Sequence, residues 1–128
     1  MLQGKVLIVD DNPVRRQVLG EYLTELNYSF VEASNGKEAI EIFEREPFDM
    51  IFMDLHMPVM NGIDTTKYIR TKLPFPKNRV IIIANTVYNY KDFFDDFYNV
   101  GFNDIIPNPY TIQTLSNLIN YHKISSSR

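Results

Sequence analysis

Residues 50–58 have the sequence MIFMDLHMP, an apolar run that ends in a carboxylate. The run is too short for an isolated helix and suits a strand that is buried on both faces of a sheet. Asp54 stands where this strand would emerge, and Pro58 with Asn61-Gly62 predicts a loop beyond it. Because ligands of open α/β sheets bind outside the carboxyl ends of the strands, Asp54 is a candidate functional residue.

The composition limits the classes of protein to which the chain can belong. Its 128 residues suit one domain, and a hydrophobic content of 45% excludes a disordered chain. A net charge of −3 argues against direct binding of nucleic acid. No apolar run reaches the ~20 residues of a membrane span. The chain has no cysteine and no signal-peptide pattern, so we expect a cytoplasmic protein, or a cytoplasmic part of a larger one.

Short apolar runs alternate with amphipathic segments along the chain. Strands are expected at residues 5–9, 29–33, 50–54, 79–84 and 104–106. Helices are expected at residues 64–72 and 91–100. Three further helices are expected after the N-cap residues Asn12, Asn35 and Thr111. Five strands that alternate with five helices predict an α/β fold, a parallel sheet with helices on both faces. We expect one domain over residues 1–124 and a flexible tail at 125–128.

Three of the expected strand ends carry residues with chemical potential. Asp10 and Asp11 follow the first strand, Asp54 ends the third and Thr86 the fourth. A single Asp at a strand end is more often a helix cap or a solvated residue, but three together would repel each other. They could stay ionised together only beside a cation, or one of them would hold a proton, and oxygen ligands favour magnesium over zinc. A carboxylate beside magnesium is a possible nucleophile toward a phosphoryl group, which the Thr86 hydroxyl could hydrogen-bond.

The sequence resembles the receiver domains of two-component response regulators. The resemblance rests on residues 6–12 (VLIVDDN) and 53–62 (MDLHMPVMNG), and it is strongest to the receivers fused to hybrid sensor kinases. It implies a flavodoxin-like three-layer sandwich with strand order 2-1-3-4-5. It also implies that Asp54 accepts a phosphoryl group from phosphohistidine and that the domain signals by a conformational change. Such a domain is not a true enzyme, since it catalyses only its own phosphorylation and dephosphorylation.

The same resemblance implies a magnesium site and a set of partners. Asp11 and Asp54 would bind Mg²⁺ directly with the backbone carbonyl of His56, and Asp10 would act largely through water. Thr86 would be the switch hydroxyl that closes on the phosphoryl group. The expected partners are a histidine kinase or a histidine phosphotransfer domain, and a second copy of the chain or an output domain.

Three positions depart from the family pattern. Asn108 stands where the family has a lysine before a cis-proline, and that lysine contacts the phosphoryl group. A charged hydrogen bond contributes about 1.5–3 kcal/mol and a neutral one about 1, so we expect Asn108 to weaken the phosphorylated state. No other lysine is an obvious substitute. Val87 would narrow the gap into which Thr86 moves, and Ile105 replaces the usual switch aromatic.

Two bulky residues are expected to flank the site. His56 and Tyr88 lie two residues beyond Asp54 and Thr86, at positions that tune hydrolysis of the acyl phosphate in the family. We expect this pair to shield the acyl phosphate from water and to slow autodephosphorylation. We do not expect the His56 imidazole to bind a metal.

Two helical surfaces are candidates for contacts with partners. The resemblance places docking of the phosphodonor at the first helix, near Val14, Arg15 and Val18, and output or dimerisation at the fourth helix and fifth strand. The fourth helix carries an apolar arc of about 160°, formed by Val100 and the aromatic residues Tyr90, Phe93, Phe94, Phe97 and Tyr98. A helix on a sheet typically buries little more than ~100°, so Phe93 or Tyr98 is expected at an exposed edge.

Three other functions remain open. A degenerate receiver would bind a partner without being phosphorylated, which the departures at Asn108, Val87 and Ile105 favour and the intact acidic residues oppose. A magnesium-dependent phosphohydrolase would use Asp54 with a second acid two residues later, where His56 stands instead. A flavin-binding protein has the least support, because no phosphate loop rich in Ser, Thr and Gly follows the first strand.

Overall fold

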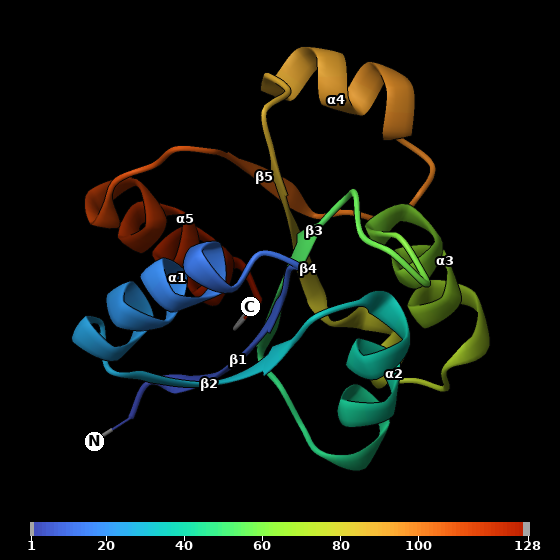
Figure 1. Cartoon of the computed structure of the whole chain (residues 1–128), viewed down its shortest axis with the longest axis horizontal. Coiled ribbons are helices and arrows are strands. Elements are labelled where there is room, and N and C mark those ends of the chain that lie inside the picture. The colour runs from blue at the N-terminus through green and yellow to red at the C-terminus, as the bar shows by residue number, and fades with distance from the viewer. Residues whose placement is uncertain (1, 127–128) are drawn as a thin grey trace.

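The computed structural model describes residues 2–126, which form a five-stranded parallel sheet between two layers of helices (Figure 1). The strands are β1 (Gly4–Val9), β2 (Tyr28–Ala33), β3 (Met50–Asp54), β4 (Ile81–Thr86) and β5 (Asp104–Pro107). The helices are α1 (Pro13–Glu25), α2 (Gly36–Arg45), α3 (Gly62–Lys72), α4 (Tyr90–Phe97) and α5 (Ile112–Ser126), with a 3₁₀ turn, η1 (Lys77–Arg79), before β4. The order β2-β1-β3-β4-β5 confirms the predicted topology. Within residues 2–126 no helix has the length and apolarity that a membrane span requires.

The central strands β1 and β3 are buried on both faces, as their apolar runs predict. Their residues at positions 6–9 and 51–53 are at most 1% exposed. Helices α1 and α5 pack on one face of the sheet, and α2, α3 and α4 on the other (Figure 1). The register pairs Val9 with Met53 and Asp54 with Asn85. The residues that end β1, β3 and β4 therefore emerge side by side at one edge.

Each strand leads into a helix through a capping side chain. Asn12, Asn35, Asn61 and Asn89 accept hydrogen bonds from backbone N–H groups in the first turns of α1, α2, α3 and α4. The Thr111 hydroxyl does the same for α5, at 3.2 Å. The caps expected at Asn12, Asn35 and Thr111 are thus confirmed. All five lie at the carboxyl edge of the sheet, where they fix the path of the chain around the candidate site.

Several element boundaries differ from those that the sequence predicts. β4 begins at Ile81 instead of residue 79, because the chain first closes the turn η1. α4 ends at Phe97, three residues early, and the chain then turns through Gly101, whose φ is 117°. α5 continues through Ser126 and so includes two residues assigned to the tail, while residues 127 and 128 lie outside the described part of the chain.

The aromatic arc of α4 is buried at its centre. Phe93 is 0% exposed, so of the two residues expected at the edges of the arc it is not the exposed one. Its ring packs against Phe97 and Phe102, with centroid distances of 5.2 and 5.3 Å. Tyr98 is 76% exposed, as expected. Tyr98 is the C-cap residue of α4 and is the exposed one of the two.

Gly62 allows the loop after β3 to pass close beneath the site. A Cβ atom at this position would lie 2.0 Å from the backbone oxygen of Asp54. We expect Gly62→Ala to lower the free energy of unfolding by about 2–3 kcal/mol, as overpacking does, in urea titrations followed by circular dichroism. Gly4→Ala is the control, because its closest atom belongs to the flexible side chain of Asp49. Equal losses in both variants would contradict this account.

Candidate functional site

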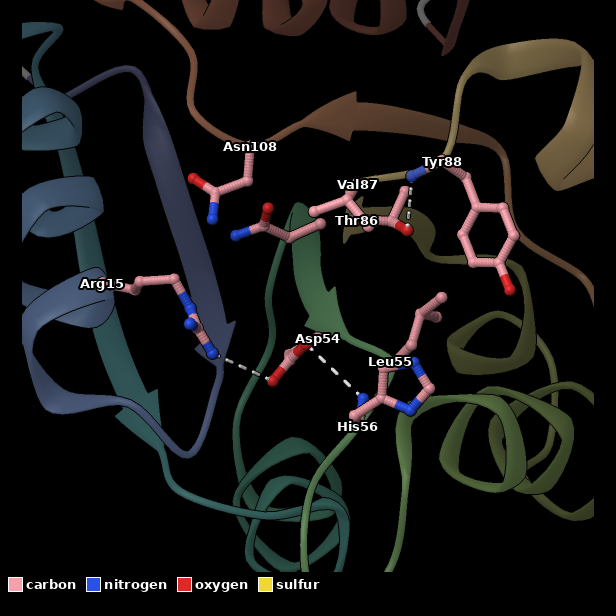
Figure 2. Close-up of a pocket in the computed structure, with 9 residues that line it drawn as sticks. Arg15, Asp54, Leu55, His56, Thr86, Val87, Tyr88 and Asn108 are labelled. Atoms are coloured by element: carbon pink, nitrogen blue, oxygen red, sulfur yellow. Dashed lines mark hydrogen bonds and ion pairs between the residues drawn. The ribbon is translucent and has the colours of Figure 1, made fainter.

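One pocket collects the residues at the carboxyl edge of the sheet (Figure 2). Asp54 lies at its centre, at the end of β3, and the other contributions come from α1, from the end of β4 and from the segment after β5. The lining residues are Arg15, Asp54, Leu55, His56, Asn85, Thr86, Val87, Tyr88 and Asn108. Four separate segments of the chain thus meet around one carboxylate.

The structure brings together the three carboxylates that the strand ends predict. Asp10, Asp11 and Asp54 each offer an oxygen within 4.8 Å of the others. The side chains of Asp10 and Asp54 are 4% and 13% exposed, whereas that of Asp11 is 40% exposed. The backbone N–H of Asn12 donates to Asp10 at 2.8 Å, so the buried member of the cluster is held by the start of α1.

Burial raises the pKa of Asp54. Desolvation, together with the negative charge of Asp10, raises the pKa of the Asp54 carboxyl from its ordinary value of 3.8 to about 6. The backbone N–H of His56, 3.5 Å from Asp54 Oδ1, and the charge of Arg15 act in the opposite direction. This competition agrees with the expectation that crowded carboxylates need either a cation or a proton.

Arg15 of α1 spans the acidic cluster, a role that the sequence reasoning missed. Its Nε and Nη2 donate to the two carboxylate oxygens of Asp10, both at 2.8 Å. Nη2 also lies 3.4 Å from Asp54 Oδ2 and 3.7 Å from Asp11 Oδ1. Hydrogen bonding to Asp10 raises the pKa of the guanidinium above its ordinary value. The available signal was the spacing of four residues from Asp11 to Arg15 at the start of a helix.

Thr86 is connected to α4 through Tyr88. Thr86 is 7% exposed, and its hydroxyl oxygen accepts the backbone N–H of Tyr88 at 3.2 Å (Figure 2). The Tyr88 ring makes edge contacts with Phe93 and Phe97, at centroid distances of 6.1 and 5.8 Å. A shift of the Thr86 hydroxyl would therefore displace Tyr88, and with it the contacts that Tyr88 makes to the buried face of α4.

The three departures from the family pattern lie in different surroundings. Asn108 lines the pocket, its peptide bond to Pro109 is cis, and its backbone N–H donates to the Thr86 carbonyl at 2.9 Å. Val87 lines the pocket and is 84% exposed. That Val87 narrows the space into which Thr86 moves stays a prediction. Ile105 is 6% exposed and belongs to the core on the α4 side of the sheet.

The donor set fits a hard divalent cation. Asp10, Asp11 and Asp54 supply carboxylate oxygens, which Mg²⁺ prefers to nitrogen or sulfur. The pocket wall also holds a buried acceptor, Asn85 Oδ1, that has no hydrogen-bond partner within residues 2–126. A water molecule of a hydrated cation could donate to it, and Mg²⁺ usually keeps several waters. Binding through the His56 carbonyl stays a prediction.

Comparisons with known proteins agree with this geometry. Residues 6–120 match the response regulator receiver domain family. The chain is 35% identical over 117 residues to hybrid signal transduction histidine kinase A of Dictyostelium discoideum. That match covers 90% of the chain but only 5% of the relative, so the chain spans a small part of that protein.

Solved structures of receivers share the fold. A receiver domain of a sensor histidine kinase from Pseudomonas aeruginosa PAO1, with a magnesium ion in its active site cleft, aligns with a TM-score of 0.82 and 30% identity. The alignment covers 92% of this chain and 95% of that one. A chemotaxis response regulator of Vibrio cholerae aligns with a TM-score of 0.84 and 26% identity, over 94% and 98% of the two chains.

The raised pKa of Asp54 predicts a stability that depends on pH. Since the pKa is about 6 in the folded protein and about 4 when unfolded, ionised Asp54 costs stability, and that cost grows as the pH rises through this window. In metal-free buffer we expect Asp54→Asn to raise the free energy of unfolding by about 1–2 kcal/mol at pH 7 and by nothing at pH 4. Urea titrations at both pH values measure this.

Asp96→Asn is the matched control, because Asp96 is an exposed carboxylate on α4. It should leave the free energy of unfolding unchanged at either pH. An Asp54→Asn protein that is less stable than the wild type at pH 7 would show that the ionised carboxylate is held favourably, against this account.

Proposed function

The chain belongs to the response regulator receiver domain family of two-component signalling, and we propose that Asp54 accepts a phosphoryl group from phosphohistidine in a phosphorelay. The observation that carries the proposal is the position of Asp54. Of the three clustered carboxylates, it is the one that lines the pocket. Thr86 lines the same pocket, so a hydroxyl donor and the acceptor carboxylate face one space. A degenerate receiver is not favoured, since the acidic cluster and Thr86 are both present and gathered there.

The transfer is a displacement at phosphorus. An oxygen of ionised Asp54 attacks the phosphorus of the donor phosphohistidine, and an O–P bond forms as the P–N bond breaks. The electron pair of the P–N bond goes to the imidazole nitrogen of the donor, which takes up a proton. Asp11, Asp54 and the His56 carbonyl would hold Mg²⁺, with Asp10 acting largely through water, and the cation would supply charge neutralisation. Attack of water on the same phosphorus returns the carboxylate and inorganic phosphate, so turnover is confined to the domain's own acyl phosphate.

The contacts of Thr86 support signalling by a conformational change. Its hydroxyl can donate to an oxygen of a phosphoryl group on Asp54, and a move toward that oxygen would strain or break the hydrogen bond from Tyr88. Tyr88 packs on Phe93 and Phe97, so its release would alter the surface of α4. Ile105 lacks an aromatic ring, and Tyr88 is placed to carry the switch instead.

Exposed apolar residues support the expected partner surfaces. Val14 and Val18 of α1 are 65% and 41% exposed beside the pocket, where a histidine kinase or histidine phosphotransfer domain must bring its phosphohistidine. Tyr90 and Tyr98 are 61% and 76% exposed and suit contacts of α4 with an output domain or a second copy. We therefore propose that the domain acts in the cytoplasm, where such donors present their phosphohistidine.

Intact mass spectrometry tests the phosphoacceptor directly. After incubation with acetyl phosphate and Mg²⁺, we expect one phosphoryl adduct, because Asp54 is the carboxylate that faces the pocket. Asp54→Asn should abolish the adduct, removal of Mg²⁺ by a chelator should suppress it, and Asp96→Asn should retain it. If acetyl phosphate gives no adduct, a phosphorylated histidine phosphotransfer domain is the second donor. Transfer from neither donor would contradict the proposal in favour of a degenerate receiver.

The lifetime of the acyl phosphate tests the shielding by His56. Its side chain lines the pocket beside Asp54 and is exposed, so truncation should let water in without unfolding the protein. We expect His56→Ala to shorten the lifetime several-fold, measured as loss of the adduct after the donor is removed. Val59→Ala is the control, because Val59 lies in the same loop and outside the pocket. An unchanged lifetime in His56→Ala would remove His56 from this role.

A further inference from the structure

We propose that Arg15 supplies to the phosphoryl group the positive charge that Asn108 does not bring. This inference rests on the proposed function, because it assigns a phosphoryl-binding residue to the Asp54 site. It also revises the expectation that the phosphorylated state is weakly held. The sequence holds no obvious substitute lysine, but the structure places an arginine from another element at the same pocket.

The position of Arg15 meets the first requirement, which is proximity to the gap left by Asn108. Within residues 2–126, Arg15 is the one permanently charged cation among the residues that line the pocket. Arg15 and Asn108 also line the adjoining groove between α1 and the segment that joins β5 to α5. Figure 2 shows the Arg15 guanidinium directed toward the Asp54 carboxylate, to which a dashed line joins it. Arg15, near the N-terminus, can thus bring to the pocket the positive charge that position 108, near the C-terminus, lacks.

The contacts of Arg15 leave it able to bind a further anion. Nε and Nη2 donate to Asp10, whereas Nη1 makes no hydrogen bond to any residue in the described part of the chain. The distance of 3.4 Å from Nη2 to Asp54 Oδ2 is long for a charged hydrogen bond. The side chain is 38% exposed, so its end can turn within the pocket. A phosphoryl group on Asp54 would place its oxygens next to this guanidinium without a movement of the backbone.

Charge and shape favour this exchange of partners. Phosphorylation adds negative charge at Asp54, while a divalent cation among the carboxylates neutralises Asp10 and weakens its attraction for Arg15. The planar guanidinium can donate two parallel hydrogen bonds to two phosphoryl oxygens, a geometry that an ammonium group does not offer. Arg15 would then act as a binding residue for the phosphoryl group, in addition to neutralising the carboxylates before transfer.

Four variants separate this role from a structural one. Arg15→Gln removes the charge, Arg15→Lys retains it, Asn108→Lys restores a lysine at the family position, and the double variant combines Arg15→Gln with Asn108→Lys. Arg45→Gln is the matched control, because Arg45 is an exposed arginine at the end of α2. Two quantities are measured with Mg²⁺ present: the initial rate of adduct formation from acetyl phosphate, and the affinity for beryllium trifluoride. The second needs no transfer of phosphate.

We expect Arg15→Gln to lower both quantities by about 10-fold to 100-fold, as the loss of a charged hydrogen bond does. Arg15→Lys should lose less. Asn108→Lys should recover most of the loss in the Arg15→Gln background, because it restores a cation at the same pocket. Arg45→Gln should stay within about twofold of the wild type. Circular dichroism shows that each variant is folded.

A spectroscopic measurement follows the guanidinium itself. The Arg15 Nε–H resonance, assigned by its loss in Arg15→Gln, should shift when beryllium trifluoride binds. An unchanged resonance would overturn the proposal, and so would an Arg15→Gln protein within about twofold of the wild type. A loss in Arg15→Gln that Asn108→Lys does not recover would also overturn it, because Arg15 would then act by holding Asp10. If the wild type neither takes up phosphate nor binds beryllium trifluoride, the function proposed for Asp54 itself fails.

Discussion

Repulsion among three carboxylates within 4.8 Å of one another is the constraint on which this site depends. The parallel sheet imposes it, because the register of β1 against β3 brings Asp10 and Asp54 to neighbouring strand ends. The same chain path supplies the compensation. Asn12 caps α1 immediately after the acidic pair, and the first turn of that helix presents Arg15 to all three carboxylates. The strand register, the Asn12 cap and the Arg15 guanidinium therefore form one electrostatic arrangement. A divalent cation can bind among the carboxylates by taking the place of the guanidinium.

The sequence predicts most of this arrangement where the signal is local. Apolar runs locate the buried strands, and the residues just after them are placed at the functional edge by topology alone. Boundaries set by tertiary contacts are harder to predict. The apolar run that forms β4 gives no sign of the turn η1 before it. α4 ends at Phe97, and the chain beyond it is held where Gly101 packs against Arg70, whose Nε donates to the Gly101 carbonyl at 2.9 Å. Phe93 is buried because Phe102 and the other aromatic residues of α4 enclose it. Phe102 lies outside the helix, so the helical periodicity of α4 does not predict this contact.

Arg15 shows the corresponding limit for the site. The resemblance to receiver domains places Arg15 only at the surface where a phosphodonor docks, and nothing in the sequence shows that its side chain turns toward the acidic cluster. Its direction is decided by the burial of Asp10, which needs a charged partner once it is removed from water. The sequence predicts a missing charge at Asn108, because a comparison along the sequence tests only the position where the family has its lysine. The pocket combines residues from α1 and from the segment after β5, and only the fold shows that one can compensate for the other.

The most direct test of this account is a crystal structure of the protein with Mg²⁺ and beryllium trifluoride at Asp54. The account predicts the metal among the carboxylates of Asp11 and Asp54 and the His56 carbonyl, with the Arg15 guanidinium donating to the fluoride atoms. It would be contradicted by a complex in which Arg15 still pairs only with Asp10 and the fluoride atoms are contacted by Asn108 or water alone. In that case, the positive charge at this site would serve to neutralise the resting carboxylates and not to hold the phosphoryl group.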